Sequence, residues 1–195
     1  MVRVVPANEV QWEDIAIVFG VRGSAFRCQC QRYRLHRRES FGSFPVEERA
    51  ARLRDQSDCG QPKSGTTSGL VAYLDDEPVG WCAVAPRAAY EGLVRNQRVP
   101  WEGRSEDKND DSVWAITCVL TRAGFRKRGI GRALAAAAVE HAHAQGARAV
   151  EAYPITTKDV ISEELHVGTV AMFADAGLEE VSRPTLRRRV MRLDF

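Results

Sequence analysis

The sequence predicts an α/β fold of the α+β type, in which a mixed, mostly antiparallel central sheet is flanked by helices. Two apolar segments, Leu70–Leu74 and Val79–Pro86, flank the turn-forming tetrapeptide Asp-Asp-Glu-Pro and are typical of an antiparallel hairpin. A β-branched apolar segment, Val113–Thr121, precedes a basic turn with two glycines, an alanine-rich helix and a second apolar segment, Ala149–Tyr153. This order predicts a right-handed β-α-β unit, whose two strands are parallel neighbours.

The composition fits one globular domain over residues 1–195. Lys and Arg number 28 against 26 Asp and Glu, and 44% of the residues are hydrophobic. The net charge of +2 is far below the basic excess that nucleic-acid-binding proteins place on one face, which argues against a nucleic-acid partner. The sequence has no signal segment at Met1 and no apolar run of about 18 residues, which predicts a cytoplasmic protein without a membrane segment and with free thiols.

The N-terminal part predicts a strand at Val2–Val5 and a helix at Trp12–Phe19, whose acidic residues fall in its first turn. Ser43 is expected to cap a further helix that runs through Leu53. The connecting regions at about 20–42, 55–68 and 87–112 lack a clear apolar period, and we expect them to be irregular insertions.

The C-terminal part predicts one more helix and two strands. Gly146 ends the alanine-rich helix, and Gly177 ends a short helix at Val170–Ala176. Apolar segments at Leu178–Ser182 and Leu186–Leu193 complete the sheet.

The basic turn after Val113–Thr121 is the segment that points most clearly to chemistry. It reads Arg126-Lys127-Arg128-Gly129-Ile130-Gly131-Arg132. Glycine lets a ligand approach the backbone, and the free amides and dipole at a helix N-terminus attract anions, so we expect a phosphate group here. The spacing excludes two other phosphate motifs, because a P-loop needs Gly-Lys-Ser/Thr and a dinucleotide-binding turn needs a third glycine.

These residues resemble the central motif of the GNAT superfamily of acyl-CoA-dependent N-acyltransferases, Arg/Gln-x-x-Gly-x-Gly/Ala after a β-strand. The segment VAYLDDEPVGW is similar to the family's central hairpin, and TVAMFADAGLEEV to its last helix and strand. The resemblance covers roughly residues 68–195 and points to a bacterial branch whose substrates are mostly unassigned. It implies the GNAT fold, acetyl-CoA as co-substrate, and an N-acetyltransferase that acts by direct attack in a ternary complex.

The resemblance also assigns the co-substrate site. The backbone of Val119, Leu120 and Thr121 is expected to pair with the pantetheine arm, and the amides and side chains of Arg126–Arg132 to hold the pyrophosphate. The acyl thioester is expected between the two parallel strands, beside Cys118–Leu120 and opposite Glu151–Tyr153. A backbone amide of Val119 or Leu120 is the expected oxyanion donor.

The acceptor is expected to be a primary amine on a small molecule or a protein. An amine with a pKa near 10.4 needs a base at neutral pH, whereas a thiol with a pKa near 8.5 leaves with little help. Glu151 is the predicted base, with an ion pair to an arginine as the alternative. The family often carries a tyrosine acid where this chain has Phe173, so Tyr153 is the predicted acid, with simple packing as its alternative.

Several other hypotheses stay open. Residues of the polar loop after Ala149–Tyr153 are weighed as alternative bases: Asp159, Glu163, Glu164 and His166. The aromatic residues Trp81, Tyr90 and Trp101 are expected to line the acceptor pocket or to belong to the core.

The predicted function also has alternatives. The Cys28-x-Cys30 pair lacks two nearby ligands, so no metal site is predicted. An arginine-rich segment, Arg27–Arg38, has aromatic residues among its cations and leaves RNA binding as a third hypothesis. A catalytically weak CoA-binding sensor is the main alternative function, and the resemblance adds a homodimer as an expectation.

Overall fold

The computed structural model describes residues 1–96, 99–156 and 160–195, including all of their side chains except those of Asn96, Val99, Ser162 and Glu163. The strands are β1 (Val2–Pro6), β2 (Gly69–Leu74), β3 (Glu77–Pro86), β4 (Val113–Thr121), β5 (Ala149–Ala152), β6 (Glu179–Ser182) and β7 (Val190–Asp194). The α-helices are α1 (Trp12–Phe19), α2 (Gly23–Cys28), α3 (Val46–Ser57), α4 (Glu91–Asn96), α5 (Ile130–Ala144) and α6 (Val170–Asp175). Short 3₁₀ helices are η1 (Ala7–Glu9), η2 (Arg87–Ala89), η3 (Val99–Trp101) and η4 (Ser162–Val167).

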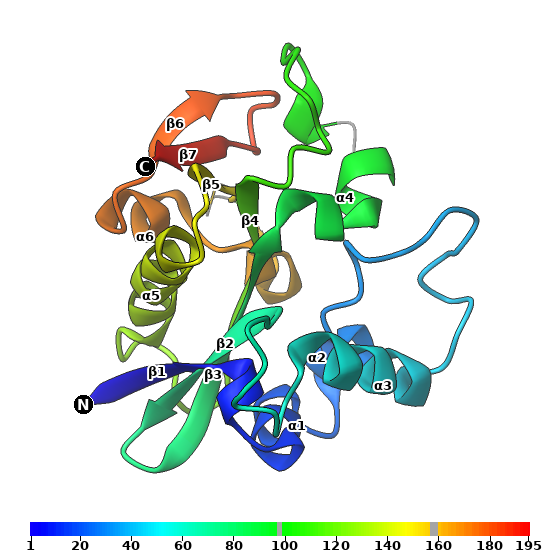
Figure 1. The fold of residues 1–195 in the computed structure, drawn as a ribbon, viewed down its shortest axis with the longest axis vertical. Helices are drawn as coiled ribbons and strands as arrows, with labels where there is room; N and C mark the ends of the chain where they lie inside the picture. Colours follow the sequence, from blue (N-terminus) through cyan, green and yellow to red (C-terminus); the bar gives the residue numbers. More distant parts are fainter. Residues whose placement is uncertain (97–98, 157–159) are drawn as a thin grey trace.

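The strands form a seven-stranded sheet in the order β1-β2-β3-β4-β5-β7-β6 (Figure 1). The central pair, β4 and β5, is parallel, and the other neighbouring pairs are antiparallel. The predicted fold class, the hairpin and the β-α-β unit are therefore confirmed.

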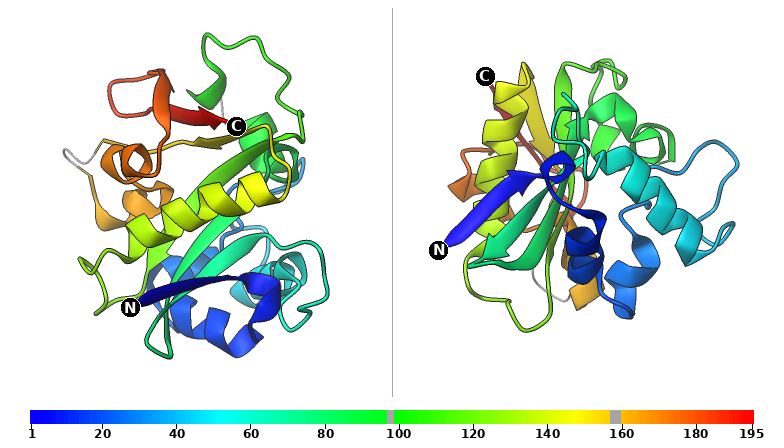
Figure 2. Two further views of the ribbon diagram at one scale, coloured as in Figure 1. Left: turned by 60° about the vertical axis from the view of Figure 1, so that its left-hand side comes forward. Right: turned by 60° about the horizontal axis from the view of Figure 1, so that its bottom comes forward.

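Helices cover both faces of the sheet, as the views of Figures 1 and 2 show. Helices α5 and α6 bury one face, and the core between them and the sheet includes Ile116, Leu134 and Phe173. Helix α1 packs on the other face against Trp81 of β3. Strand β4 is buried between these two layers over most of its length, which explains its continuous apolar sequence.

The close approach of α5 to β3 fixes where α5 begins. A Cβ atom on Gly80 would lie 2.9 Å from both Ile130 and Leu134, so only glycine fits there without a shift. Ile130 is the first residue of α5 and is buried. The basic turn is thereby held beside the C-terminal end of β4.

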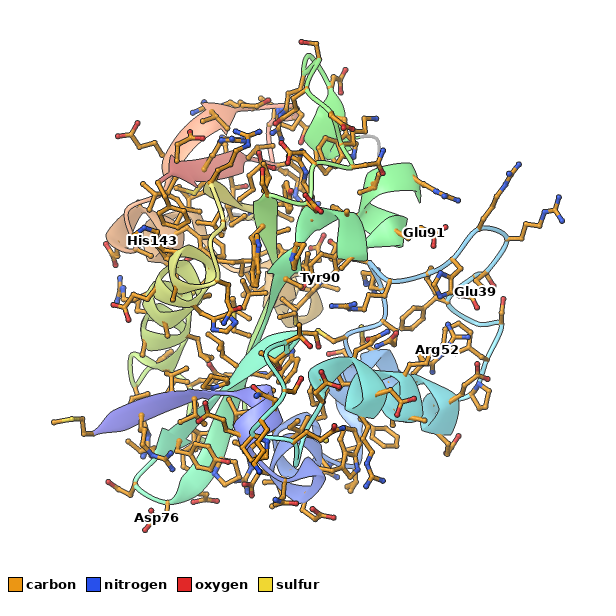
Figure 3. All side chains as sticks on the ribbon, in the orientation of Figure 1. Glu39, Arg52, Asp76, Tyr90, Glu91 and His143 are labelled. Atoms are coloured by element: carbon orange, nitrogen blue, oxygen red, sulfur yellow. The ribbon has the colours of Figure 1, made fainter. Side chains whose placement is uncertain are left out.

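Some expected boundaries are wrong. Helix α3 begins after Pro45, whereas the hydroxyl of Ser43 is bound to Ser40 and caps no helix. An ion pair between Arg52 of α3 and Glu39, both labelled in Figure 3, ties α3 to the preceding loop. Strand β7 begins at Val190, later than expected. Among the described residues, no helix is both long and apolar enough to cross a lipid bilayer.

Candidate functional site

The two parallel strands separate after a short paired stretch. Pairing of β4 with β5 runs from Val113–Ala149 to Ile116–Ala152, but β4 continues to Thr121 along β3. In an antiparallel pair, alternate residues direct their N–H and C=O groups away from the partner strand. Over Val119–Thr121, part of the β4 backbone therefore faces the side that β5 has left. This is the stretch at which the family resemblance places the pantetheine arm.

The turn between β4 and α5 has the conformation expected of an anion-binding loop. Lys127 and Gly129 have positive φ angles of 64° and 79°. Gly129 is the N-cap of α5, and the first amides of a helix have no partner inside the helix. Nothing lies within 4 Å of the position that a Cβ atom of Gly129 would take, so the approach to these amides is open.

The predicted cations differ in how they are engaged. Arg126, Lys127 and Arg128 are exposed, and the guanidinium of Arg128 lies over the ring of Phe125, 5.4 Å from its centroid. Arg132 instead forms an ion pair with Asp175, at 2.5 Å. Three of the four predicted side chains are therefore available to an incoming polyanion, and Arg132 is already paired.

A cleft of about 840 Å³ lies next to this turn. Its walls come from the end of α1, from α2 and the segments before and after it, from the end of β4, from the basic turn and from η4. Lining residues that matter below are Phe19, Cys30, Cys118, Leu120, Arg126 and His166.

The cleft is strongly cationic. Five arginines line it and, among the described residues, no Asp or Glu does. One of them, Arg122, is paired with Glu77, but the other four form no ion pair within the described part of the chain: Arg22, Arg27, Arg32 and Arg126. Such a wall favours an anionic ligand, because unpaired guanidinium groups bind phosphate and carboxylate oxygens in bidentate fashion.

Glu151 lies outside this cleft, in a buried cluster of arginines. Its fully buried carboxylate forms ion pairs with Arg192 at 2.8 Å, with Arg87 at 3.3 Å and with Arg104. Burial alone would raise the pKa of Glu151, but the hydrogen bond from Arg104 and the charges of Arg104 and Arg87 outweigh burial and lower it. This is the ion-pair environment that the sequence left as the alternative, and it disfavours proton uptake.

Tyr153 shares this cluster. Its hydroxyl donates to Glu151 Oε2 at 2.8 Å, and burial followed by the Glu151 charge raises its pKa well above the usual value. The ring also lines a second cavity of about 100 Å³ together with Tyr33, Arg188 and Arg189. Phe173, in the place of the family's tyrosine, is fully buried in the core.

The alternative bases are in different surroundings. Asp159 lies outside the described residues, as does the side chain of Glu163. Glu164 pairs with Arg187 at 2.9 Å, and the hydrogen bond from Arg187 lowers its pKa. His166 lines the large cleft, and its ring centroid lies 6.3 Å from that of Tyr33.

The three aromatic residues of the acceptor hypothesis belong to the core. Trp81, Tyr90 and Trp101 are buried, and Figure 3 labels Tyr90 near the middle of the view. Trp101 lies under the Glu151 cluster, with Arg87 and Arg104 within 5.4 Å of its ring centroid.

Sequence reasoning missed two features of this region. The arginines around Glu151 come from distant segments, and no local pattern pairs them. The cysteines of the cleft carried a signal in Cys28-x-Cys30, but this segment has no apolar period that would place it.

A protein-family model matches most of the chain. Residues 31–166 match the model described as "Acetyltransferase (GNAT) family". A search of curated proteins found no significant match.

Solved structures with similar folds include yncA from Salmonella typhimurium with its cofactor acetyl-CoA (12% identity, 99% of this chain and 93% of that chain, TM-score 0.57). A ribosomal-protein-alanine N-acetyltransferase from Brucella melitensis is similar at 15% identity (100% and 99%, TM-score 0.55). A paia N-acetyltransferase from Thermoplasma acidophilum in complex with coenzyme A is similar at 11% identity (100% and 99%, TM-score 0.51). At these identities the likeness shows the fold.

Proposed function

The chain belongs to the acetyltransferase (GNAT) family, and on that basis we propose that it transfers the acetyl group of acetyl-CoA to a primary amine by direct attack in a ternary complex. Acetyl-CoA is the co-substrate, and acetyl transfer is the general activity of the family. The observation that carries the proposal is the unpaired edge of β4 at Val119–Thr121, which leads directly into the open amide turn of Gly129.

The residues fit the co-substrate at both ends. Open amides at the start of α5 and the exposed cations Arg126 and Arg128 suit a pyrophosphate. The edge of β4 that β5 leaves free at Val119–Thr121 suits the amides of a pantetheine arm, because an added strand can pair with such an edge. When bound, acetyl-CoA supplies an activated acetyl thioester, and a fixed backbone amide of Val119 or Leu120 is the proposed donor to its carbonyl oxygen.

The amine must lose its proton before or during attack. The roles of Glu151 as base and Tyr153 as acid remain predictions. The three ion pairs of Glu151 instead support a role in which it holds β5 in position. His166 lines the cleft, and an imidazole is a suitable base near neutral pH. We propose His166 as the group that takes the amine proton.

The proposed activity is tested with an amine screen on the purified full-length chain. Acetyl-CoA is supplied at a saturating concentration, and free CoA is measured chromatographically with amines that do or do not carry a carboxylate or phosphate. We expect amine-dependent CoA release, with anionic amines preferred because the cleft wall is cationic. Micromolar acetyl-CoA binding in calorimetry, without release for any amine, would favour the sensor function, for which Phe173 and the paired Glu151 are the supporting observations.

The pyrophosphate assignment predicts a specific pattern of affinity losses. Replacing either Arg126 or Arg128 by glutamine should weaken acetyl-CoA binding roughly 10- to 100-fold, because a hydrogen bond to a charged group contributes about 1.5–3 kcal/mol. S-acetylpantetheine, which has no pyrophosphate, should bind almost unchanged. Arg132→Gln is the matched control, because Asp175 already engages its guanidinium. Equal losses for both ligands would contradict the assignment.

A further inference from the structure

Cys30 is turned toward the cleft by an unusual backbone conformation. It follows α2 and, with Gln29, forms two consecutive residues with positive φ angles, 46° and 56°. Residues other than glycine rarely adopt positive φ angles, and such a conformation persists only where surrounding contacts stabilise it. Here the side-chain amide of Gln29 donates to the Phe26 carbonyl at 2.9 Å, and that of Gln31 donates to the Gln29 carbonyl at 3.2 Å.

The Cys30 sulfur accepts a hydrogen bond and packs in the same cluster as a second thiol. The indole Nε1–H of Trp81 donates to Sγ at 3.3 Å, and Cys118 on β4 belongs to the packed cluster that holds Trp81 and Cys30. An indole N–H can only donate, so the sulfur that receives it is the one best placed to carry a negative charge. Trp81 is itself held in place, since a Cβ atom on Gly69 would lie 2.5 Å from its ring.

The charges around the pair favour ionisation of Cys30. The hydrogen bond from Cys118 lowers the pKa of Cys30, burial opposes this, and the Trp81 hydrogen bond and the Arg34 charge add to it. The same hydrogen bond raises the pKa of Cys118, as does its burial.

Neighbouring titratable groups do not reverse the lowering of the Cys30 pKa. Burial raises the pKa of Cys28, of Cys82 on β3 and of Tyr33, so these groups are neutral neighbours near pH 7. Cys30 is thus the thiol of this group whose pKa is lowered.

Both sulfurs are in reach of the cleft. Cys30 and Cys118 belong to its lining, and Cys118 directly precedes the β4 backbone assigned to the pantetheine arm. Both thiols are free in the structure. A partly accessible thiol of lowered pKa, packed in one cluster with a second thiol, is the arrangement of a redox-sensitive pair.

We propose that Cys30 and Cys118 form a dithiol that a peroxide converts into an intramolecular disulfide, and that acetyl-CoA in the cleft slows this oxidation. The Cys30 thiolate attacks one peroxide oxygen, the O–O bond breaks and the leaving hydroxide becomes water, which gives Cys30 sulfenic acid. The Cys118 sulfur then attacks the Cys30 sulfur, the S–O bond breaks, and the oxygen leaves as water with the Cys118 proton. Two thiols and one peroxide thereby yield one disulfide and two waters, and a small thiol reverses the reaction by exchange.

The test treats the reduced, full-length protein with one equivalent of hydrogen peroxide and maps disulfides by mass spectrometry without reduction. We expect a Cys30–Cys118 linkage in the wild type and in the controls Cys28→Ser and Cys59→Ser. In Cys118→Ser, dimedone should trap Cys30 as its sulfenic acid, and Cys30→Ser should give neither product. A disulfide through Cys28, a covalent dimer, or no disulfide at peroxide levels that oxidise other residues would overturn the pair.

Two further measurements test the reactivity of Cys30 and the place of the cysteine pair in the cleft. The rate of iodoacetamide alkylation at Cys30 should rise through a midpoint below that of an ordinary thiol, and Trp81→Phe should move this midpoint up. Saturating acetyl-CoA should slow disulfide formation at least fivefold, and an unchanged rate would overturn the placement of the pair in the occupied cleft. Calorimetry under the same conditions separates this outcome from a failure of acetyl-CoA to bind, which would instead contradict the proposed function.

Discussion

Gly129→Glu is expected to abolish detectable acetyl-CoA binding, with a loss of at least about 100-fold, while the folded structure is kept. The N-cap position of α5 is open and points its free amides at the site assigned to the pyrophosphate. A carboxylate there opposes the bound phosphates, and two like charges about 4 Å apart at a protein surface repel by roughly 4 kcal/mol. Calorimetric titration with acetyl-CoA measures the effect.

Gly129→Gln separates charge from backbone strain. The φ angle of 79° strains any residue other than glycine, so both variants share this cost and differ only in charge. We expect the glutamine variant to lose affinity about tenfold or less. If the two variants weaken binding equally, with equal melting temperatures, the phosphates do not sit at this turn.

The layout of the sheet was predictable because its signals are local. Val113–Thr121 is buried on both faces and reads as one apolar segment, and its predicted bounds match those of β4. Gly129 and Gly146 lie on either side of α5, both with positive φ angles, so the ends of this helix could also be predicted from the sequence. The basic turn was found for the same reason, since its function depends on neighbouring residues in the chain.

The surroundings of the catalytic candidates were not predictable, because they depend on contacts between distant segments. Arg104 and Glu151 are 47 residues apart, and nothing in either segment indicates the partner. Trp81 and Cys30 are 51 residues apart and meet only because α1, α2 and β3 share one face of the fold. Local patterns therefore found the co-substrate turn, and tertiary contacts decide the chemistry of Glu151 and Cys30.

Replacing Glu151 by glutamine is expected to destabilise the protein by about 3–5 kcal/mol near neutral pH. Removing one partner of a buried ion pair leaves uncompensated charge in a medium that solvates it poorly. Here three guanidinium groups lose a shared carboxylate, and the less buried Glu106 still contacts all three. Chemical denaturation at pH 7 measures the change.

Two matched variants control for this prediction. Glu180→Gln makes the same substitution at a partly exposed carboxylate between Arg183 and Arg189, and should cost less than about 1 kcal/mol. Tyr153→Phe removes a single hydrogen bond to Glu151 and should cost about 1 kcal/mol. A Glu151→Gln loss no larger than that of Glu180→Gln would contradict the buried cluster.

The pH dependence follows from the lowered pKa of Glu151. A carboxylate whose pKa is lower in the folded than in the unfolded chain contributes its full stability above the unfolded value, about 4.3. That contribution is lost as the pH falls through the folded pKa. The stability difference between wild type and Glu151→Gln should therefore be constant near neutrality and begin to shrink below about pH 4. It should vanish once the pH is below the folded pKa, where the protonated wild-type side chain is as neutral as glutamine.

The same variant also distinguishes a positioning role from a catalytic one. Once an acceptor amine is known, turnover is measured well below the melting temperature of Glu151→Gln, with His166→Gln beside it. A positioning role predicts that the folded Glu151→Gln enzyme keeps its acetyl-CoA affinity and most of its kcat, whereas His166→Gln lowers kcat roughly 100-fold. The opposite result, with kcat lost in the Glu151 variant and kept in the His166 variant, would make Glu151 the base despite its three ion pairs.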